Sequence, residues 1–464
     1  MKYKFHIIKK CEVLVKHLPK TVMVFIISII IMTSFSSCSQ EMFNLDELMH
    51  PPKMGEEQAQ IYEALTAVVG TNITLRYPKS GENRSAFTME DLDGDFQSEG
   101  IVLYEDSSRS NVIRINILKK TNNKWISVYD AAGLSTDIEK IGIVSFALNS
   151  PKQLVIGFDL VDGNKKSLVV YEWNDNGLSP VFTENYLFFD FVKLNRENFS
   201  SLMLINSNEN GNEAKIVKKS SSNFAIVAQT KLNPLSKTYS HLTVSTGVDD
   251  TTYFYLASSR GVGLSTEIIA YESYSLKNIT MSDKVDFEQL TYRTSNMYSK
   301  DIDNDQIVEI PVFQPLPGFE KAEAENKKYY IKWCHFSGKN DSIVLTPKLY
   351  TVTNNRYNYY FIMPETWVEK VTLSDSNTTE NIWTFIKYDS NIYFNEEEIF
   401  SVGVFKNSEL DDQKRKILDE EGYIYLLSDG TNKIYGKINK NSNQNNQEFK
   451  IEINELSKRI KLIK

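Results

Sequence analysis

Residues 91–104 read DLDGDFQSEGIVLY, so that an acidic loop leads directly into an apolar run. Residues 301–313, DIDNDQIVEIPVF, repeat this arrangement. Both loops have Asp at their first, third and fifth positions and Glu at the ninth, and these residues are Asp91, Asp93, Asp95 and Glu99 in the first acidic loop (residues 91–99) and Asp301, Asp303, Asp305 and Glu309 in the second acidic loop (residues 301–309). An acidic turn followed by β-branched and aromatic residues predicts a loop that enters a β-strand.

The chain between the two acidic loops predicts a repeated β-structure. Short runs of β-branched and aromatic residues alternate with Asn, Asp, Ser and Gly from about residue 71 to residue 347. Three turns precede comparable runs at Asn149, Asn195 and Asp249, and together with Asp93 and Asp303 they lie about fifty residues apart. This period matches a four-stranded propeller blade. We therefore expect a mainly β fold with a β-propeller-like body of five to seven blades, whereas a β-sandwich or an irregular set of hairpins is the alternative.

The ends of the chain differ from this body. Residues 56–69 place Ile61, Leu65 and Val68 at helical spacing, with acids at the start and Gly70 after the end, which predicts an amphipathic helix. A sixth unit is expected to start near Asn354 and Asn355. After residue 350, strand-like runs are joined by a charged helix over residues 408–418 and a basic amphipathic tail over residues 449–464, which indicates an α+β domain.

The first forty residues predict export. Six lysines precede the apolar run over residues 22–32, as in a secretion signal, and this run is shorter than the ~20 residues that span a bilayer. The sequence FSSC at residues 35–38 resembles a bacterial lipobox. This resemblance implies that Cys38 becomes the first residue of the mature chain and carries lipid, palmitate included, on the extracytoplasmic face of the cell membrane. An uncleaved membrane anchor is the alternative.

The expected organisation is a signal peptide over residues 1–37, a tether over 38–55, the helix and propeller-like domain over 56–350, and the α+β domain over 351–464. The full chain has a net charge of −8, and removal of a lysine-rich signal makes the remainder more acidic. This charge disfavours nucleic acid as a partner and is compatible with divalent metals. Cys11 lies in the signal and Cys38 is expected to carry lipid, so Cys334 has no partner for an intrachain disulfide.

The acidic loops contain the oxygen ligands that calcium prefers. Calcium takes six to eight oxygens, which carboxylates at alternate positions of a tight turn can provide. The loops resemble those of the FG-GAP or VCBS repeat family, which follow Asp-x-Asp-x-Asp-Gly-x-x-Asp and bind calcium in β-propellers. The resemblance implies that the four acids of each loop bind calcium and that Gln97 and Ile307 provide backbone oxygens. In the alternative interpretation the carboxylates only accept hydrogen bonds from turn amides.

Two features depart from this family, because Phe96 and Gln306 replace the glycine at position six and Glu replaces Asp at position nine. Residues 45–104 and the sequence FIMPETW at 361–367 resemble a group of lipoproteins of clostridial Firmicutes. That resemblance implies a Gram-positive host and supports the expected layout. It implies no activity.

The sequence contains no strong catalytic motif, and we assign no catalytic residue. His50, His241 and His335 form no His-Glu-x-x-His pattern. Cys334 and His335 are neighbours on an expected strand and therefore point to opposite faces, so we expect Cys334 to be a buried structural residue. The chain is thus predicted to be a non-enzymatic binding module for an envelope or extracellular partner. The alternatives are an envelope glycan hydrolase that uses an Asp/Glu pair and a structural or assembly factor of an envelope complex.

Overall fold

The computed structural model describes residues 55–160, 165–175, 177–220, 223–247, 250–281, 286–337, 343–389, 397–439 and 447–463. The expected signal peptide, Cys38 and nearly all of the tether lie outside these residues. The chain divides into two units, Met1–Ala64 and Leu65–Lys464. Within the described residues, each helix is too short or too polar to cross a membrane.

The helix α4 (Glu56–Val69) has the predicted bounds. Its first-turn acids face the positive end of the helix dipole, and Gly70 follows in a left-handed conformation, with a φ of 89°. Ile61 and Leu65 are fully buried, as predicted, but Val68 is 63% exposed. The prediction that Val68 lies on the buried face was therefore wrong, because the buried stripe is narrower than the spacing indicated.

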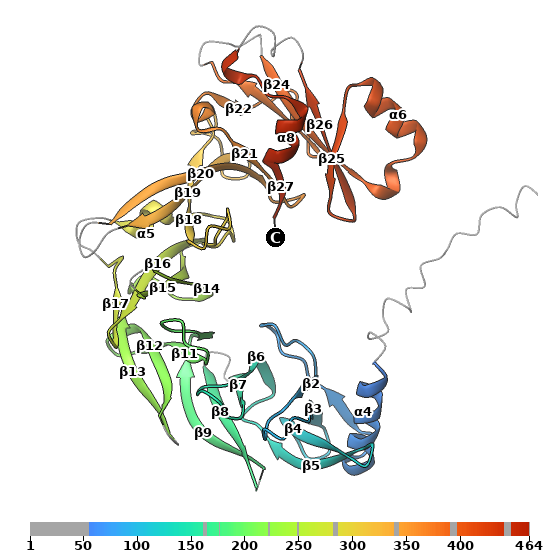
Figure 1. Cartoon of the computed structure of the whole chain (residues 1–464), viewed down its shortest axis with the longest axis vertical. Helices are drawn as coiled ribbons and strands as arrows, with labels where there is room; N and C mark the ends of the chain where they lie inside the picture. Colours follow the sequence, from blue (N-terminus) through green and yellow to red (C-terminus); the bar gives the residue numbers. More distant parts are fainter. Residues whose placement is uncertain are drawn as a thin grey trace, which may run out of the picture. The chain divides into compact units, whose positions relative to one another are not determined.

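The described residues form six separate antiparallel sheets, which makes the fold mainly β (Figure 1). In the first sheet, β1 and β2 both pair with β3, which continues into β4 and β5. The next three sheets are meanders of four strands each.

The strands of the first four sheets are β1 (Ile73–Leu75), β2 (Phe87–Glu90), β3 (Glu99–Asp106), β4 (Ser110–Thr121) and β5 (Lys124–Ala132); β6 (Asp137–Val144), β7 (Gln153–Asp159), β8 (Lys166–Asn174) and β9 (Gly177–Tyr186); β10 (Phe188–Val192), β11 (Ser201–Asn208), β12 (Gly211–Ser220) and β13 (Asn223–Lys231); and β14 (Tyr239–Thr246), β15 (Thr252–Arg260), β16 (Gly263–Glu272) and β17 (Ser275–Asn278).

The fifth sheet follows the short helix α5 (Phe287–Thr291) and is completed by a strand from the end of the chain. Its strands are β18 (Glu309–Pro315), β19 (Tyr329–Ser337), β20 (Val344–Asn354), β21 (Tyr359–Met363) and β27 (Ile460–Leu462). The sixth sheet has the order β22-β23-β24-β26-β25, made of β22 (Val371–Leu373), β23 (Ile382–Lys387), β24 (Glu398–Lys406), β25 (Ile424–Ser428) and β26 (Asn432–Ile438).

The remaining helices lie near the C-terminus and are α6 (Asp412–Glu420), α8 (Ile453–Arg459) and the 3-10 turns η1 (Glu365–Trp367), η2 (Asn407–Glu409) and η3 (Gln447–Phe449). The predicted charged helix begins later than expected because the Asp411 carboxylate accepts a hydrogen bond from the Lys414 N–H and caps α6. The predicted basic tail is divided between η3, α8 and β27.

The sixth unit does not start where it was expected. Asn354 ends β20 and Asn355 lies in the hairpin turn between β20 and β21, so both residues belong to the fifth sheet. The sixth sheet begins with β22, after the turn η1. The boundary expected after residue 350 falls inside β20, and Val352, Phe361 and Phe400 lie in one hydrophobic core. That division of the chain into domains stays a prediction.

Consecutive sheets share hydrophobic cores, and neighbouring residues of one strand enter different cores. Residue pairs that join the sheets in chain order are Ile101 and Ile156, Val155 and Leu204, Ile205 and Phe254, Tyr255 and Ile310, and Phe361 and Phe400. Because side chains alternate between the two faces of a strand, adjacent apolar residues cover both faces of each central strand. This burial explains why the central strands are continuous apolar runs.

A buried polar residue begins the strand that follows the expected turn in each of the first five sheets. These residues are Glu99, Gln153, Ser201, Thr252 and Glu309. The three long side chains each accept a hydrogen bond from the backbone N–H seven residues earlier, in Leu92, Phe146 and Ile302 respectively, at 2.8 to 3.2 Å. The same local contact therefore recurs in three sheets, at the position where the expected repeat places its turn.

Glu267 in β16 provides the first test of the packing between sheets. It is fully buried and accepts hydrogen bonds from the Asn233 N–H, the Ser236 hydroxyl and the Asn278 amide, at 2.8 to 3.2 Å. We expect Glu267→Ala to lower the free energy of unfolding by about 2–4 kcal/mol, because it leaves buried donors without an acceptor. Urea denaturation measures this loss.

Glu272→Ala is the matched control, since Glu272 is an exposed residue of the same strand. Its effect should stay within about 0.5 kcal/mol. Equal losses in the two variants would contradict the role given to Glu267.

Candidate functional site

The first acidic loop connects β2 to β3 and is organised by its own carboxylates. Asp91 accepts hydrogen bonds from the N–H groups of Gly94 (2.7 Å) and Phe96 (3.0 Å). Asp95 accepts one from the N–H of Gln97 at 2.7 Å. The predicted alternative, in which these carboxylates bind turn amides, thus describes part of their role.

The second acidic loop precedes β18 and has the same pattern. Asp301 accepts hydrogen bonds from the N–H groups of Asp305 (3.1 Å) and Gln306 (2.8 Å), and Asp305 accepts one from Ile307 at 2.9 Å. Asp303 is exposed and accepts no hydrogen bond within the described residues. Its carboxylate is therefore available to a ligand.

The missing glycines do not change the backbone of the loops. Phe96 and Gln306 have φ values of 67° and 72°, in the left-handed region that glycine adopts most easily. The fourth positions, Gly94 and Asn304, are also left-handed, with φ values of 82° and 64°. Phe96 is 97% exposed, so its side chain does not stabilise this conformation by burial. The carboxylate-to-amide hydrogen bonds hold both loops in it.

Three carboxylates converge in each loop. Asp91, Asp93 and Glu99 form one group, and Asp301, Asp303 and Glu309 form the other, each with one ligand oxygen per residue within 4.8 Å of the others. Glu99 and Glu309 are buried, and burial raises the pKa of both carboxyl groups. The acids of positions one, three and nine therefore lie close together in each loop, whereas Asp95 does not belong to the first group.

The two loops differ in the residue that lies opposite the ninth-position Glu on the neighbouring strand. Lys119 in β4 forms an ion pair with Asp93, and its ammonium lies 3.8 Å from Glu99. In the second loop the corresponding place belongs to His335 in β19, whose Nε2 lies 2.6 Å from the Glu309 Oε1 and 3.8 Å from Asp305. Asp305, Glu309 and His335 form a third convergent group.

This difference decides how well each loop fits a metal ion. The first loop already holds a positive charge, the Lys119 ammonium, among its carboxylates. The second loop has carboxylates at three ligand positions and His335 in the place of this lysine. Lys348 pairs with Asp305 at 3.3 Å, but Asp305 lies outside the group of Asp301, Asp303 and Glu309. Calcium needs converging oxygen ligands, and that group offers them without an ion-paired lysine within the described residues. Gln97 and Ile307 each donate a hydrogen bond through the backbone N–H. That their backbone oxygens bind calcium stays a prediction.

Cys334 is a free, buried thiol, as predicted. Burial raises its pKa to about 11, so the thiol stays protonated at neutral pH. His335, its neighbour in β19, points instead to the second acidic loop. The two side chains thus have separate environments.

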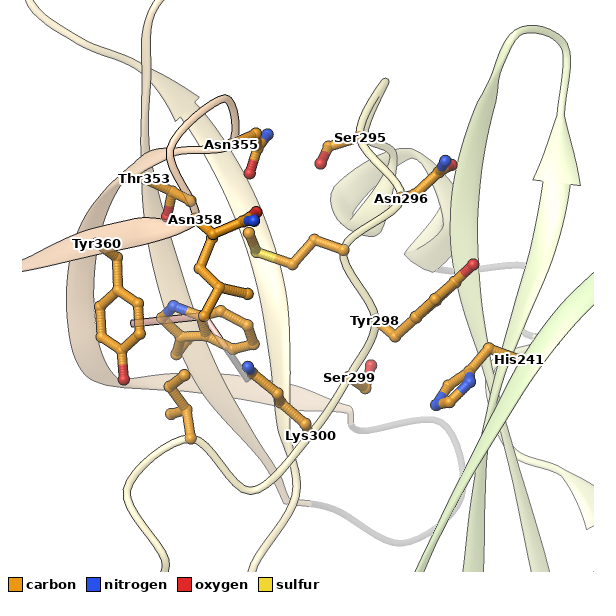
Figure 2. A pocket seen from close by; sticks show the side chains of 14 residues that line it. His241, Ser295, Asn296, Tyr298, Ser299, Lys300, Thr353, Asn355, Asn358 and Tyr360 are labelled. Atoms are coloured by element: carbon orange, nitrogen blue, oxygen red, sulfur yellow. The ribbon is translucent and has the colours of Figure 1, made fainter. Parts of the chain in front are cut away.

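A separate cavity of 610 Å³, the Lys300 pocket, lies beside the second acidic loop (Figure 2). Its lining residues come from β14, from the segment 295–302, from β19, and from the hairpin of β20 and β21 with residue 463. They are His241, Ser295, Asn296, Met297, Tyr298, Ser299, Lys300, Ile302, Trp333, Thr353, Asn355, Asn358, Tyr360 and Ile463. This volume is within the usual range of small-molecule sites.

The wall of the pocket over residues 295–300 is held at both ends. Isolated β-bridges join Arg293 to Leu264 and Lys300 to Glu309. The Arg293 Nε donates to the Met297 carbonyl, and the Thr243 hydroxyl donates to the Ser299 carbonyl. These contacts place Tyr298 so that its ring stacks on His241, with centroids 4.3 Å apart and planes 18° apart.

A second cavity, of 640 Å³, is lined by β6, β10, the start of β14 and residues 80–83. It contains Glu82, Glu139 and Asp190. Glu139 accepts a hydrogen bond from the Tyr186 hydroxyl at 2.6 Å and pairs with Lys166 at 2.9 Å, while Asp190 pairs with Lys140 at 2.6 Å. Two of its carboxylates are thus neutralised by lysines.

The sequence revealed the acidic loops but not His335 as their neighbour, nor the pocket. His335 contacts Glu309 because β18 and β19 pair in one register. The only sequence signal for the pocket was the departure from strand pattern between Arg293 and Lys300. The pocket residues are separated by more than two hundred positions along the chain.

No protein-family model and no curated protein matches this chain. Among solved structures, an exo-β-1,3-galactanase from Phanerochaete chrysosporium with galactose is similar over 72% of this chain and 79% of that chain, at 11% identity and a TM-score of 0.26. An exo-β-1,3-galactanase from Clostridium thermocellum is similar over 85% of this chain and 100% of that chain, at 10% identity and a TM-score of 0.28. Similarity at these TM-scores carries no argument about reaction or ligand.

Proposed function

We propose that this chain is a lipid-anchored extracytoplasmic protein that binds a glycan of the envelope or of the extracellular space without cleaving it. The composition of the Lys300 pocket carries the proposal. Within the described residues, the pocket is lined mainly by aromatic, amide and hydroxyl side chains, with Lys300 and a few apolar residues, and by no Asp or Glu. Glycoside hydrolysis normally needs two carboxylates at the scissile bond, whereas binding needs flat apolar faces and hydrogen-bonding groups.

The second cavity is less suited to hydrolysis than its acids suggest. Glycoside hydrolysis uses carboxyl groups that contact the scissile bond, and two of the acids in this cavity already contact lysines. Lys166 and Lys140 pair with Glu139 and Asp190 at 2.9 and 2.6 Å. A glycan hydrolase that uses this cavity is therefore a weaker candidate function than glycan binding at the Lys300 pocket.

The propeller-like body forms part of the proposal. Its support is the succession of meanders in which consecutive sheets share cores, together with the repeated hydrogen bond of Glu99, Gln153 and Glu309. Five to seven blades of about fifty residues would account for both. The similarity of the acidic loops to those of FG-GAP or VCBS repeats also belongs to this proposal.

We further propose that calcium binds the second acidic loop and stabilises the body. The first loop is the weaker calcium site, because Lys119 already neutralises Asp93 and lies near Glu99. Asp303 is the most informative ligand to change, since its carboxylate is exposed and supports no backbone hydrogen bond within the described residues.

Thermal unfolding of the full chain with calcium or with chelator tests the metal. Calcium at 100 times its dissociation constant should raise the midpoint by about 3 °C if the chain unfolds as one unit. Asp303→Asn should remove most of this shift, whereas Asp93→Asn should leave most of it. Asp412→Asn, a fully exposed carboxylate in α6, is the charge control. No calcium shift, or equal shifts in Asp303→Asn and wild type, would contradict the proposal.

Lipid attachment is tested by growth of expressing cells with an alkynyl palmitate. Wild type should incorporate the label and sediment with membranes, and Cys38→Ala should lose at least nine-tenths of the label, because the substitution removes the proposed site of lipid attachment. Cys334→Ala should keep the label, since Cys334 is buried. Label that persists in Cys38→Ala would overturn the assignment.

Glycan binding is tested with the labelled full chain on an array of soluble neutral and acidic oligosaccharides. Tyr360→Ala, which removes a ring of the pocket, should weaken binding by at least tenfold, because stacking faces contribute much of the affinity for a sugar. Tyr274→Ala, at a residue that is 77% exposed, should change it by less than twofold.

The bound oligosaccharides should show no new reducing ends after incubation with wild type. Release of reducing ends that disappears in Glu139→Gln would instead favour the hydrolase. Binding that is equal in Tyr360→Ala and wild type would remove the pocket from the proposal.

A further inference from the structure

The Lys300 pocket contains a cation without an acidic partner. Lys300 is half-buried, and its ammonium lies 6.0 Å from the centroid of the Trp333 ring. It forms no ion pair or side-chain hydrogen bond within the described part of the chain. Figure 2 shows its side chain in the space between Tyr298 and Tyr360.

A second cation without a described carboxylate partner, Arg293, is hydrogen-bonded to the same wall of the pocket. Arg293 is 2% exposed, and its Nη1 donates to the Thr266 hydroxyl and the Thr291 carbonyl. Its Nη2 is buried without a hydrogen-bond partner in the described residues. A buried cation usually has a carboxylate partner, and this one makes its described hydrogen bonds to neutral oxygens only. The wall over residues 293–300 thus carries two positive charges in a protein whose net charge is −8.

The rest of the pocket offers groups for an uncharged polar body. The amides of Asn296, Asn355 and Asn358 and the hydroxyls of Tyr298 and Tyr360 have no hydrogen-bond partner within the described residues. Amides and hydroxyls both donate and accept, as the hydroxyl groups of a sugar require. Aromatic rings provide flat surfaces on which the apolar face of a sugar ring can pack.

We propose that the Lys300 pocket binds an acidic sugar, in which a carboxylate or phosphate is attached to a polyhydroxylated ring. The anionic group pairs with Lys300, and the amides and tyrosines hold the ring. This inference deepens the proposed function and rests on it, because it specifies the class of glycan. A pocket for a neutral sugar would not need a half-buried lysine without an acidic partner, whereas a bound anion would compensate for the partial desolvation of this ammonium.

Matched probes separate the anion from the ring. Isothermal titration of the full chain should be carried out with D-glucuronate, D-glucose, glucose 6-phosphate, acetate and inorganic phosphate. We expect glucuronate or glucose 6-phosphate to bind at least tenfold more tightly than glucose. Acetate and inorganic phosphate should bind at least tenfold more weakly than the corresponding acidic sugar, because they lack the ring.

Two variants of one residue test the role of its charge. Lys300→Met keeps about the length of the side chain and should remove the preference for acidic sugar over glucose, because it removes the ammonium that pairs with the anion. Lys300→Arg should retain at least part of the preference. Lys332→Met is the control, since Lys332 is the neighbour of Trp333 in β19 and does not line the pocket. Circular dichroism spectra and unfolding midpoints confirm that each variant folds.

The outcomes distinguish this inference from the proposed function. Glucose and acidic sugars that bind equally would overturn the acidic class and leave glycan binding intact. Simple anions that bind as tightly as the acidic sugars would show an anion site without sugar recognition and would also overturn the inference. If no probe binds and the glycan array shows no effect of Tyr360→Ala, the proposed function itself fails.

Discussion

Three long polar side chains that begin buried strands accept hydrogen bonds from the preceding loop, and the loops depend on this contact. Glu99, Gln153 and Glu309 begin buried strands, where an unpaired carboxylate or amide would cost about 1–3 kcal/mol. Each accepts the backbone N–H seven residues earlier. The contact joins the loop to the first residue of the strand that follows it. It therefore links a local turn to the packing of a whole sheet.

The first and second acidic loops share a backbone conformation but contact different side chains on the neighbouring strand. Lys119 and His335 occupy corresponding places across the strand pair, yet one presents an ammonium and the other an imidazole. The backbone conformations agree, as the left-handed Phe96 and Gln306 show. The loops therefore differ in charge while they agree in shape. This difference is the reason to expect metal at the second loop.

The Lys300 pocket lies where an irregular segment interrupts the succession of regular strands. The segment between Arg293 and Lys300 replaces a regular strand and is held at both ends by single β-bridges. Because it is anchored by Arg293 and Thr243, its side chains form a fixed wall with Tyr360 and Trp333 opposite. Regular sheets provide the support, and the irregular segment provides the site.

Local patterns in the sequence determined the mainly β fold, the bounds of α4, the convergence of acids in each loop and the burial of Cys334, because each depends on residues that are close along the chain. The start of the sixth sheet was misplaced, since Asn354 ends β20 and Asn355 lies in the hairpin turn that leads to β21 of the same sheet. Only the tertiary structure decided that His335 meets Glu309, that Lys119 enters the first loop and that Lys300 faces a pocket. These contacts depend on strand register and on packing between sheets, and residues far apart in sequence determine both together.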